Sequence, residues 1–298
     1  MKYEVVDTFR QYEELLAIKN VEKRAEYFRY TMMKPFEEMW EAIHVPLKAK
    51  QESGYDVLIA SKMLGFADVT DSKTIKQSLA TLKQNQTLEI AAMALKTNMK
   101  QAMKHGLVVQ AEEVKLGLFI ADREKLSLQK GYVGFGGIPG FIQLMVYPTS
   151  YNLPKIPALI AHEFHHNLRF SYMEWNHGNV TVGDYLVIEG LAESYAKELF
   201  GEKQMGPWVT TMDADDLDYS IAVIAEALDV RGFAEVSSYM FGDEIARKEG
   251  YKPVGLSFGA GYAVGYKVVQ AFMEKTNKTI FEATLLSSEE IIEESGVF

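Results

Sequence analysis

Apolar residues recur at helical spacing from residue 7 to about residue 110. Asp7 or Thr8 can cap a first helix, and a second helix rich in aromatic and methionine side chains ends before Pro46. Residues 72–105 continue the pattern, with polar residues between apolar positions that lie three or four residues apart. This pattern indicates packed helices with solvated outer faces, and residues 1–110 are therefore predicted to form an N-terminal helical region.

The pattern changes after residue 110, where apolar stretches have the length of strands. Residues 114–121 read VKLGLFIA and are rich in residue types that favour strands. Residues 132–147 read YVGFGGIPGFIQLMVY, which predicts two extended pieces on either side of a turn that contains glycine and proline. A small antiparallel or mixed sheet is expected here.

Helical spacing returns near Pro157, which is suited to the first turn of a helix over residues 156–170. A second helix is predicted from Asp184, as its N-cap, to Phe200, and Gly201 is suited to end it. Because these helices follow the predicted strands, we expect an α+β protein that is mainly helical.

The last clear helical segment begins near Ser257 and contains Gly259, Gly261 and Gly265. Glycine inside a helix costs about 1 kcal/mol relative to alanine. Glycines at this density are therefore expected only where another part of the chain packs closely against them.

The helix over residues 156–170 contains His162, Glu163 and His166 in the order HExxH. At about 100° per residue, the two histidines project about 40° apart, so both imidazoles can reach one metal ion. Glu163 lies beside them, where its carboxylate can accept a proton from a metal-bound water. The motif predicts metal-assisted hydrolysis, with peptide bonds as the expected substrate.

A catalytic zinc site usually has three protein ligands and one open position. The metzincin pattern would place glycine and histidine where this chain has Arg169 and Tyr172, so that class is excluded. Glu189 on the following helix emerges from an apolar stripe, where a buried carboxylate needs a partner. The expected ligands of one zinc ion per chain are His162, His166 and Glu189, and a surface position on an ordinary amphipathic helix is the alternative for Glu189.

Glu193 lies one turn beyond Glu189 on the same side of the predicted helix. Metal-bound imidazole usually donates its other N–H to a carboxylate, so Glu193 is predicted to orient a ligand histidine, with a structural ion pair as the alternative. A di-iron carboxylate site would need a second Glu-x-x-His motif, but Glu189 is followed three residues later by Ala192. A di-iron site is therefore not expected.

The order of these motifs resembles that of a known family. HEFHH at residues 162–166, followed by EGLAESYA at residues 189–196, resembles the gluzincin arrangement, whose third ligand lies in a Glu-Gly-hydrophobic-Ala stretch. With GYAVGY at residues 261–266, the chain is similar over about residues 110–290 to the bacterial YjaZ-like family of predicted Zn-dependent proteases.

The resemblance implies a zincin-like fold. Its α+β half would cover residues 111–183 and carry the sheet and the HExxH helix. A helical half would cover residues 184–298 and carry Glu189, and both would belong to one compact protein with a central cleft.

Hydrolysis also needs a hydrogen-bond donor for the developing oxyanion. Tyr262 and Tyr266 share one helix face, and the resemblance also suggests them, with helix packing as the alternative role. His165 is expected to line the cleft, whereas His177 lies in a loop that could reach the site or be exposed to solvent. The edge of a neighbouring strand could hold an extended peptide, or the strand could be purely structural.

Composition narrows the range of partners. The net charge is -10, and no cluster of Lys and Arg is long enough to follow a phosphate backbone, so nucleic acid is not an expected partner. No apolar run has the length of a membrane span and no signal-peptide pattern begins the chain, so we expect no membrane partner and a cytoplasmic location. The absence of cysteine excludes thiolate ligands and a Cys nucleophile.

The predicted function is zinc-dependent hydrolysis of a peptide or protein substrate, with no cofactor other than zinc. The alternative is a non-catalytic peptide-binding or regulatory protein that retains the zincin fold.

Overall fold

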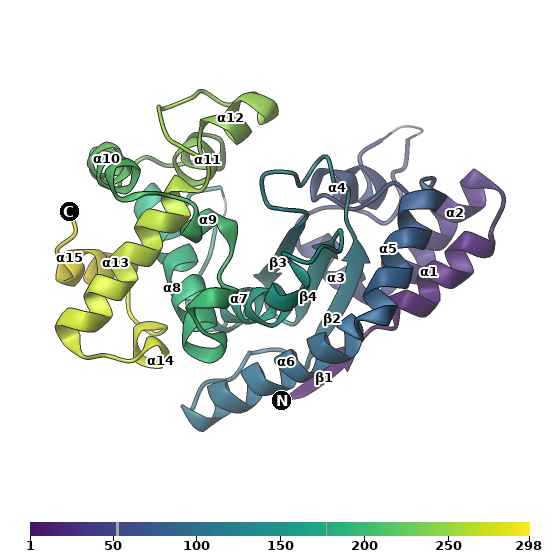
Figure 1. The fold of residues 1–298 in the computed structure, drawn as a ribbon, viewed down its shortest axis with the longest axis horizontal. Helices are drawn as coiled ribbons and strands as arrows, with labels where there is room; N and C mark the ends of the chain where they lie inside the picture. The colour runs from purple at the N-terminus through teal and green to yellow at the C-terminus, as the bar shows by residue number, and fades with distance from the viewer. Residues whose placement is uncertain (52–53, 177) are drawn as a thin grey trace. The chain divides into compact units, whose positions relative to one another are not determined.

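The computed structural model describes residues 1–51, 54–176 and 178–298. Four strands and fifteen α-helices follow one another along these residues, together with short 3-10 and π-helical turns (Figure 1). The chain divides into two compact units, which consist of residues 1–100 with 108–167 and of residues 101–107 with 168–298.

A four-stranded mixed sheet lies in the first unit, with the strand order β1-β2-β4-β3. Neighbouring strands are parallel except for β3 and β4, which pair antiparallel. The strands are β1 (Lys2–Val5), β2 (Glu113–Ile120), β3 (Tyr132–Ile138) and β4 (Phe141–Val146). The expected α+β class and the mixed sheet are therefore confirmed.

β1 lies in the region that was expected to be helical, so that prediction is wrong at the first residues. Lys2 pairs with Glu113 and Val5 with Leu116, in parallel register. Four residues with two charged side chains are too short a segment for a periodic pattern to reveal a strand. The strand depends on a neighbour more than a hundred residues away in the chain.

The helix that was expected to end before Pro46 is broken into several pieces. Pro35 lies in a 3-10 turn, where it has no N–H to donate and its ring crowds the preceding turn. The pieces are α2 (Val21–Tyr27), a π-helical turn (Phe28–Met32), the 3-10 turn (Lys34–Phe36) and α3 (Glu37–Ala42). The other helices of the N-terminal region are α1 (Thr8–Ala17), which Asp7 caps, α4 (Val57–Met63), α5 (Ser72–Gln84) and α6 (Thr87–Lys104).

The sheet is covered differently on its two faces. Phe36 packs against Phe119 of β2 and Phe141 of β4, with ring centroids 5.7 and 6.4 Å away. Gly134 of β3 belongs to the opposite face by its pairing with Leu144, and both Gly134 and Gly136 meet α7 (Ile156–Arg169). The HExxH helix therefore lies directly against the edge strand of the sheet.

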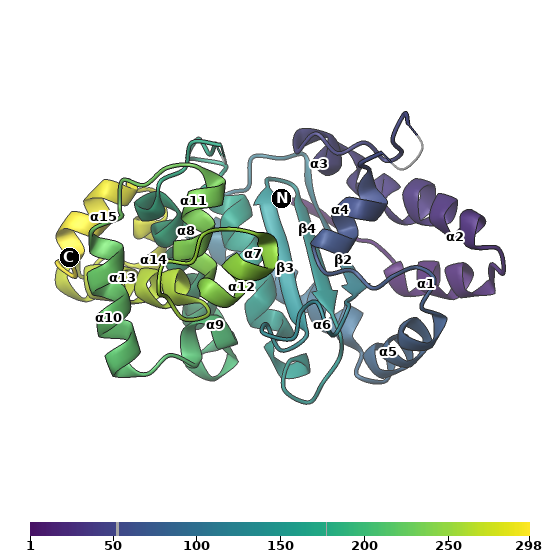
Figure 2. The ribbon, with the colours of Figure 1, turned by 90° about the horizontal axis from the view of Figure 1, so that it is seen from above.

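The second unit is helical. α8 (Val182–Phe200) is buried along most of its length and lies beside α13 (Ala260–Thr276), as Figures 1 and 2 both show. The remaining helices are α9 (Pro207–Thr210), α10 (Ala214–Ala225), α11 (Phe233–Phe241), α12 (Asp243–Glu249), α14 (Ile280–Ala283) and α15 (Ser288–Ser295). Across the described residues, no helix has both the length and the apolar character that crossing a bilayer requires.

α8 begins one turn earlier than the prediction placed it. Thr181, not Asp184, is its N-cap, and the two residues form a capping box in which each side chain bonds to the other's backbone N–H. Gly201 follows the last turn with a φ of 84°, so its predicted role at the C-terminal end is confirmed.

The glycines of α13 lie where other helices approach closely, as predicted. A Cβ on Gly265 would overlap the carbonyl oxygen of Leu186, and a Cβ on Gly190 would overlap the carbonyl of Gly265. One turn earlier, Gly261 lies against Met240 of α11. The backbones of α8 and α13 are therefore in contact beside Glu189.

Candidate metal centre

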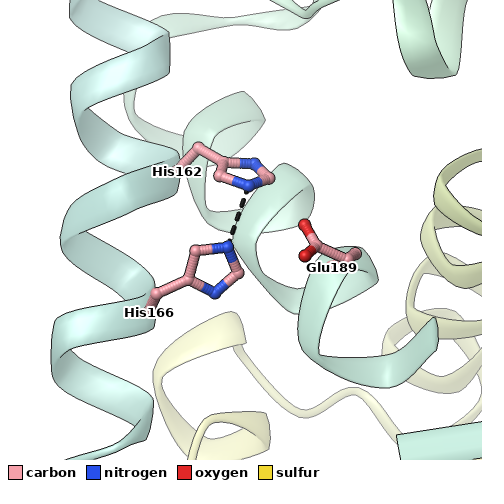
Figure 3. A group of neighbouring side chains, drawn as sticks. All are labelled: His162, His166 and Glu189. Atoms are coloured by element: carbon pink, nitrogen blue, oxygen red, sulfur yellow. Dashed lines mark hydrogen bonds between the residues drawn. The ribbon is translucent and has the colours of Figure 1, made fainter. Parts of the chain in front are cut away.

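The three predicted ligands come together. His162 and His166 lie one turn apart on α7, and Glu189 projects from α8 (Figure 3). Their ligand atoms all lie within 4.8 Å of one another. The side chains are buried, with 5%, 7% and 4% of their surfaces exposed.

The donor set fits a zinc ion. Nε2 of His162 and Nε2 of His166 are 3.0 Å apart, and one of the two carries the proton when they share a hydrogen bond. Tetrahedral zinc with bonds of about 2.1 Å places two ligand nitrogens about 3.4 Å apart, so the rings already have nearly the required spacing. Two imidazoles and one carboxylate are also the ligands of many catalytic zinc sites.

Glu163 is buried on the same helix, with 4% of its surface exposed, and its side chain lies against β3. A Cβ on Gly134 would be 2.5 Å from Cδ of Glu163 and would also overlap Cγ and Oε1. The carboxylate therefore lies directly on the backbone of the edge strand.

Asn167 connects α7 to the turn between β3 and β4. Its Oδ1 accepts a hydrogen bond from the backbone N–H of Gly140 at 2.7 Å, and its Nδ2 donates to the carbonyl oxygens of Gly136 at 2.7 Å and Phe141 at 3.0 Å. The sequence interpretation missed this residue. Its position is the one sequence feature that could have indicated a role, because its amide side chain follows the motif directly and lies one turn beyond Glu163.

Glu193 is buried on α8, with 2% of its surface exposed, and its carboxylate accepts a hydrogen bond from the indole N–H of Trp208. Trp208 lies 15 residues further along the chain, and the sequence interpretation missed it as well. Its ring centroid is 6.4 Å from that of Tyr262. The indole that donates to this carboxylate therefore also lies near the ring of Tyr262.

The two tyrosines of α13 have different surroundings. The ring of Tyr262 lies near those of Trp208 and Phe241, with centroids 6.4 and 6.1 Å away. Tyr266 lies under Nζ of Lys197, 5.4 Å from the ring centroid. Burial raises the pKa of the Tyr266 hydroxyl, and its hydrogen bond with Lys197 offsets part of that rise.

Two further histidines were candidates for the cleft, namely His165, and His177 with exposure to solvent as its alternative. His165 is fully buried on α7. His177 lies outside the described residues.

The protein therefore combines an α+β fold with a buried group of two histidines from α7 and one glutamate from α8, and residues of these types bind zinc in many hydrolases. The particular family follows from the sequence. The chain belongs to the family described as predicted Zn-dependent protease (DUF2268), whose profile matches residues 94–293. The resemblance to the YjaZ-like family is therefore confirmed.

Two relatives come from Bacillus subtilis (strain 168). The chain is 58% identical to uncharacterized protein YjfC over 291 residues, which cover 98% of this chain and 97% of the relative. It is 26% identical to uncharacterized protein YjaZ over 141 residues, which cover 47% of this chain and 50% of the relative. No solved structure matches the chain.

Proposed function

We propose that this protein hydrolyses peptide bonds with one zinc ion, held by His162, His166 and Glu189. The observation that carries the proposal is the buried group of these three side chains on and beside the helix that bears Glu163. A buried carboxylate beside two imidazoles would be costly without a positive charge, and zinc would supply that charge.

The two histidines would bind through Nε2, and the carboxylate of Glu189 would supply the third ligand atom. When bound, zinc acts as a Lewis acid and lowers the pKa of water towards neutrality. Glu193 would hold its neighbours in place through the hydrogen bond from Trp208, and we also retain it as a candidate to orient a ligand histidine.

Glu163 would act as the general base. Its carboxylate would take a proton from the water as the water oxygen attacks the scissile carbonyl carbon, and would then deliver that proton to the leaving amine nitrogen. The carbonyl oxygen gains charge in this step and needs a donor. Tyr262 and Tyr266 are the proposed donors, because both lie on α13, the helix that packs against α8 beside Glu189.

β3 is the strand that would hold the peptide. β4 pairs with β2 on one side and β3 on the other, so its edges are both occupied, whereas β3 is last in the strand order. An extended peptide could add to β3 through backbone hydrogen bonds. That arrangement would place the scissile bond on the strand against which Glu163 packs.

The proposal is tested with the purified protein and a Glu163→Gln variant. Metal analysis should find about one zinc per chain in both, because Glu163 is not a ligand. Turnover of a quenched-peptide library should fall at least about 100-fold in Glu163→Gln, since a general base contributes about 10²–10⁴-fold. Glu198→Gln, an exposed change on α8, is the control and should leave both values unchanged.

The outcomes distinguish a peptidase from a non-catalytic peptide-binding protein. Zinc in the wild type together with loss of turnover in Glu163→Gln supports the peptidase. Zinc-loaded wild type that cleaves no peptide of the library, but binds some of them, would instead favour a non-catalytic peptide-binding protein.

A further inference from the structure

The strand β3 carries glycine at the positions that face Glu163. At Gly134, a Cβ would overlap Cγ and Oε1 of the glutamate and lie 2.5 Å from Cδ. Real Cβ atoms essentially never approach another heavy atom below 3.0 Å, so any side chain at this position must displace Glu163 or the strand. The rotamer of Glu163 therefore depends on the absence of a side chain at Gly134.

Gly136 has the same relation to the backbone of the helix. Its Cβ would overlap the carbonyl oxygen of Glu163 and lie 2.9 Å from its Cα. The carbonyl oxygen of Gly136 also accepts the hydrogen bond from Nδ2 of Asn167. Asn167 also bonds to Gly140 in the turn that follows β3 and to Phe141 at the start of β4, so the strand and the helix are held at backbone contact.

The next glycine shows that this close approach is local. A Cβ on Gly137 would meet only the ring of Phe135, at 3.6 Å, which is an ordinary van der Waals contact. Gly137 is a glycine of β3 like Gly134 and Gly136, but it does not face the helix. The requirement for glycine is therefore tied to Glu163 and is not a general property of β3.

We propose that Gly134 is a positioning residue for the hydrolytic reaction. It lets the carboxylate of Glu163 lie against the edge strand, and Gly136 and Asn167 keep that strand in place. The same contact puts the base beside the strand edge on which the peptide is proposed to lie. This inference rests on the proposed function, because it assigns Glu163 the role of general base.

Gly134→Ala is the first test, with the exposed change Glu198→Gln on α8 as the control for activity. Gly134→Ala should keep about one zinc per chain and a KM within about twofold, while kcat falls about 100-fold, the cost expected for a displacement of about 1 Å. Glu198→Gln should stay within about twofold in kcat and KM. A kcat for Gly134→Ala within about threefold of wild type, or loss of its zinc, would overturn the proposal.

A stability cycle tests the contact without any need for turnover. Gly134→Ala should lower Tm by roughly 5 °C in the wild type and in Glu163→Gln, whose side chain has the same size. In Glu163→Ala the overlapping atoms Cγ, Cδ and Oε1 are absent, so the methyl group added at residue 134 should lower Tm only slightly.

The cycle also covers the case in which Gly134→Ala does not fold, because Gly134→Ala/Glu163→Ala should then recover folding. Equal losses of Tm in all three backgrounds would overturn the proposal. A wild type that shows no turnover would contradict the proposed function, but the Tm values of the cycle could still be compared. Failure of the proposed function and failure of the Gly134 contact are therefore distinguishable.

Discussion

α7 and α8 both bring buried residues of the candidate metal centre into place through close contacts at glycine, but against different partners. α7 approaches a strand, and the approach is held by the side chain of Asn167. α8 approaches the helix α13, and Gly190 and Gly265 allow their backbones to touch. The difference follows from backbone chemistry.

A helix satisfies its interior N–H and C=O groups by itself, so two helices need only small residues to come close. The turn after an edge strand leaves backbone groups that the strand cannot pair. Asn167 supplies both a donor and an acceptor for them. Disrupting each contact should therefore lower the free energy of unfolding by a different amount.

The largest effect is expected at the crossing of α8 and α13. Gly190→Val would place atoms on the backbone of Gly265, which cannot move without shifting the whole helix, so the free energy of unfolding should fall by about 3 kcal/mol or more. Denaturant unfolding measures this loss of free energy. Glu198→Val, an exposed change on the same helix, separates helix propensity from the crossing and should cost less than about 1 kcal/mol. Equal costs for both changes would show that the two helices are not in contact.

A smaller effect is expected for Asn167→Ala. The change leaves the N–H of Gly140 and two carbonyl oxygens without their side-chain partner, and we expect a loss of about 2–3 kcal/mol in unfolding free energy. Asn85→Ala removes one exposed hydrogen bond to Thr81 and should change the same quantity by less than about 0.5 kcal/mol. If the two variants unfold alike, Asn167 does not hold the strand to the helix.

The smallest effect is expected for Trp208→Phe, which keeps an aromatic ring beside Tyr262 but removes the indole donor to Glu193. A hydrogen bond to a buried carboxylate is worth about 1.5–3 kcal/mol, and part of that loss should vanish once Glu193→Gln removes the charge. A double-mutant cycle of the two changes should therefore give a coupling energy of about 1 kcal/mol. Additive effects would mean that the indole is not a partner of the carboxylate.

Local patterns were sufficient for much of the fold. The two extended pieces around the turn, the HExxH helix and the Gly201 end of α8 each depend on residues close together in the chain. Where the pattern was short or interrupted, prediction was wrong. β1 needed its distant partner β2, the helix before Pro46 was broken at Pro35, and the start of α8 was displaced by one turn from Asp184 to Thr181.

The sequence by itself determined that His162 and His166 project from one side of a helix, because an α-helix converts spacing along the chain into direction. It also indicated that the glycines of α13 must meet a close neighbour. Only the tertiary structure decided which neighbours those are, that Glu163 lies on the glycines of β3, and that Asn167 and Trp208 support the site. The reason is that each of these contacts joins elements whose separation in sequence carries no information about their distance in space.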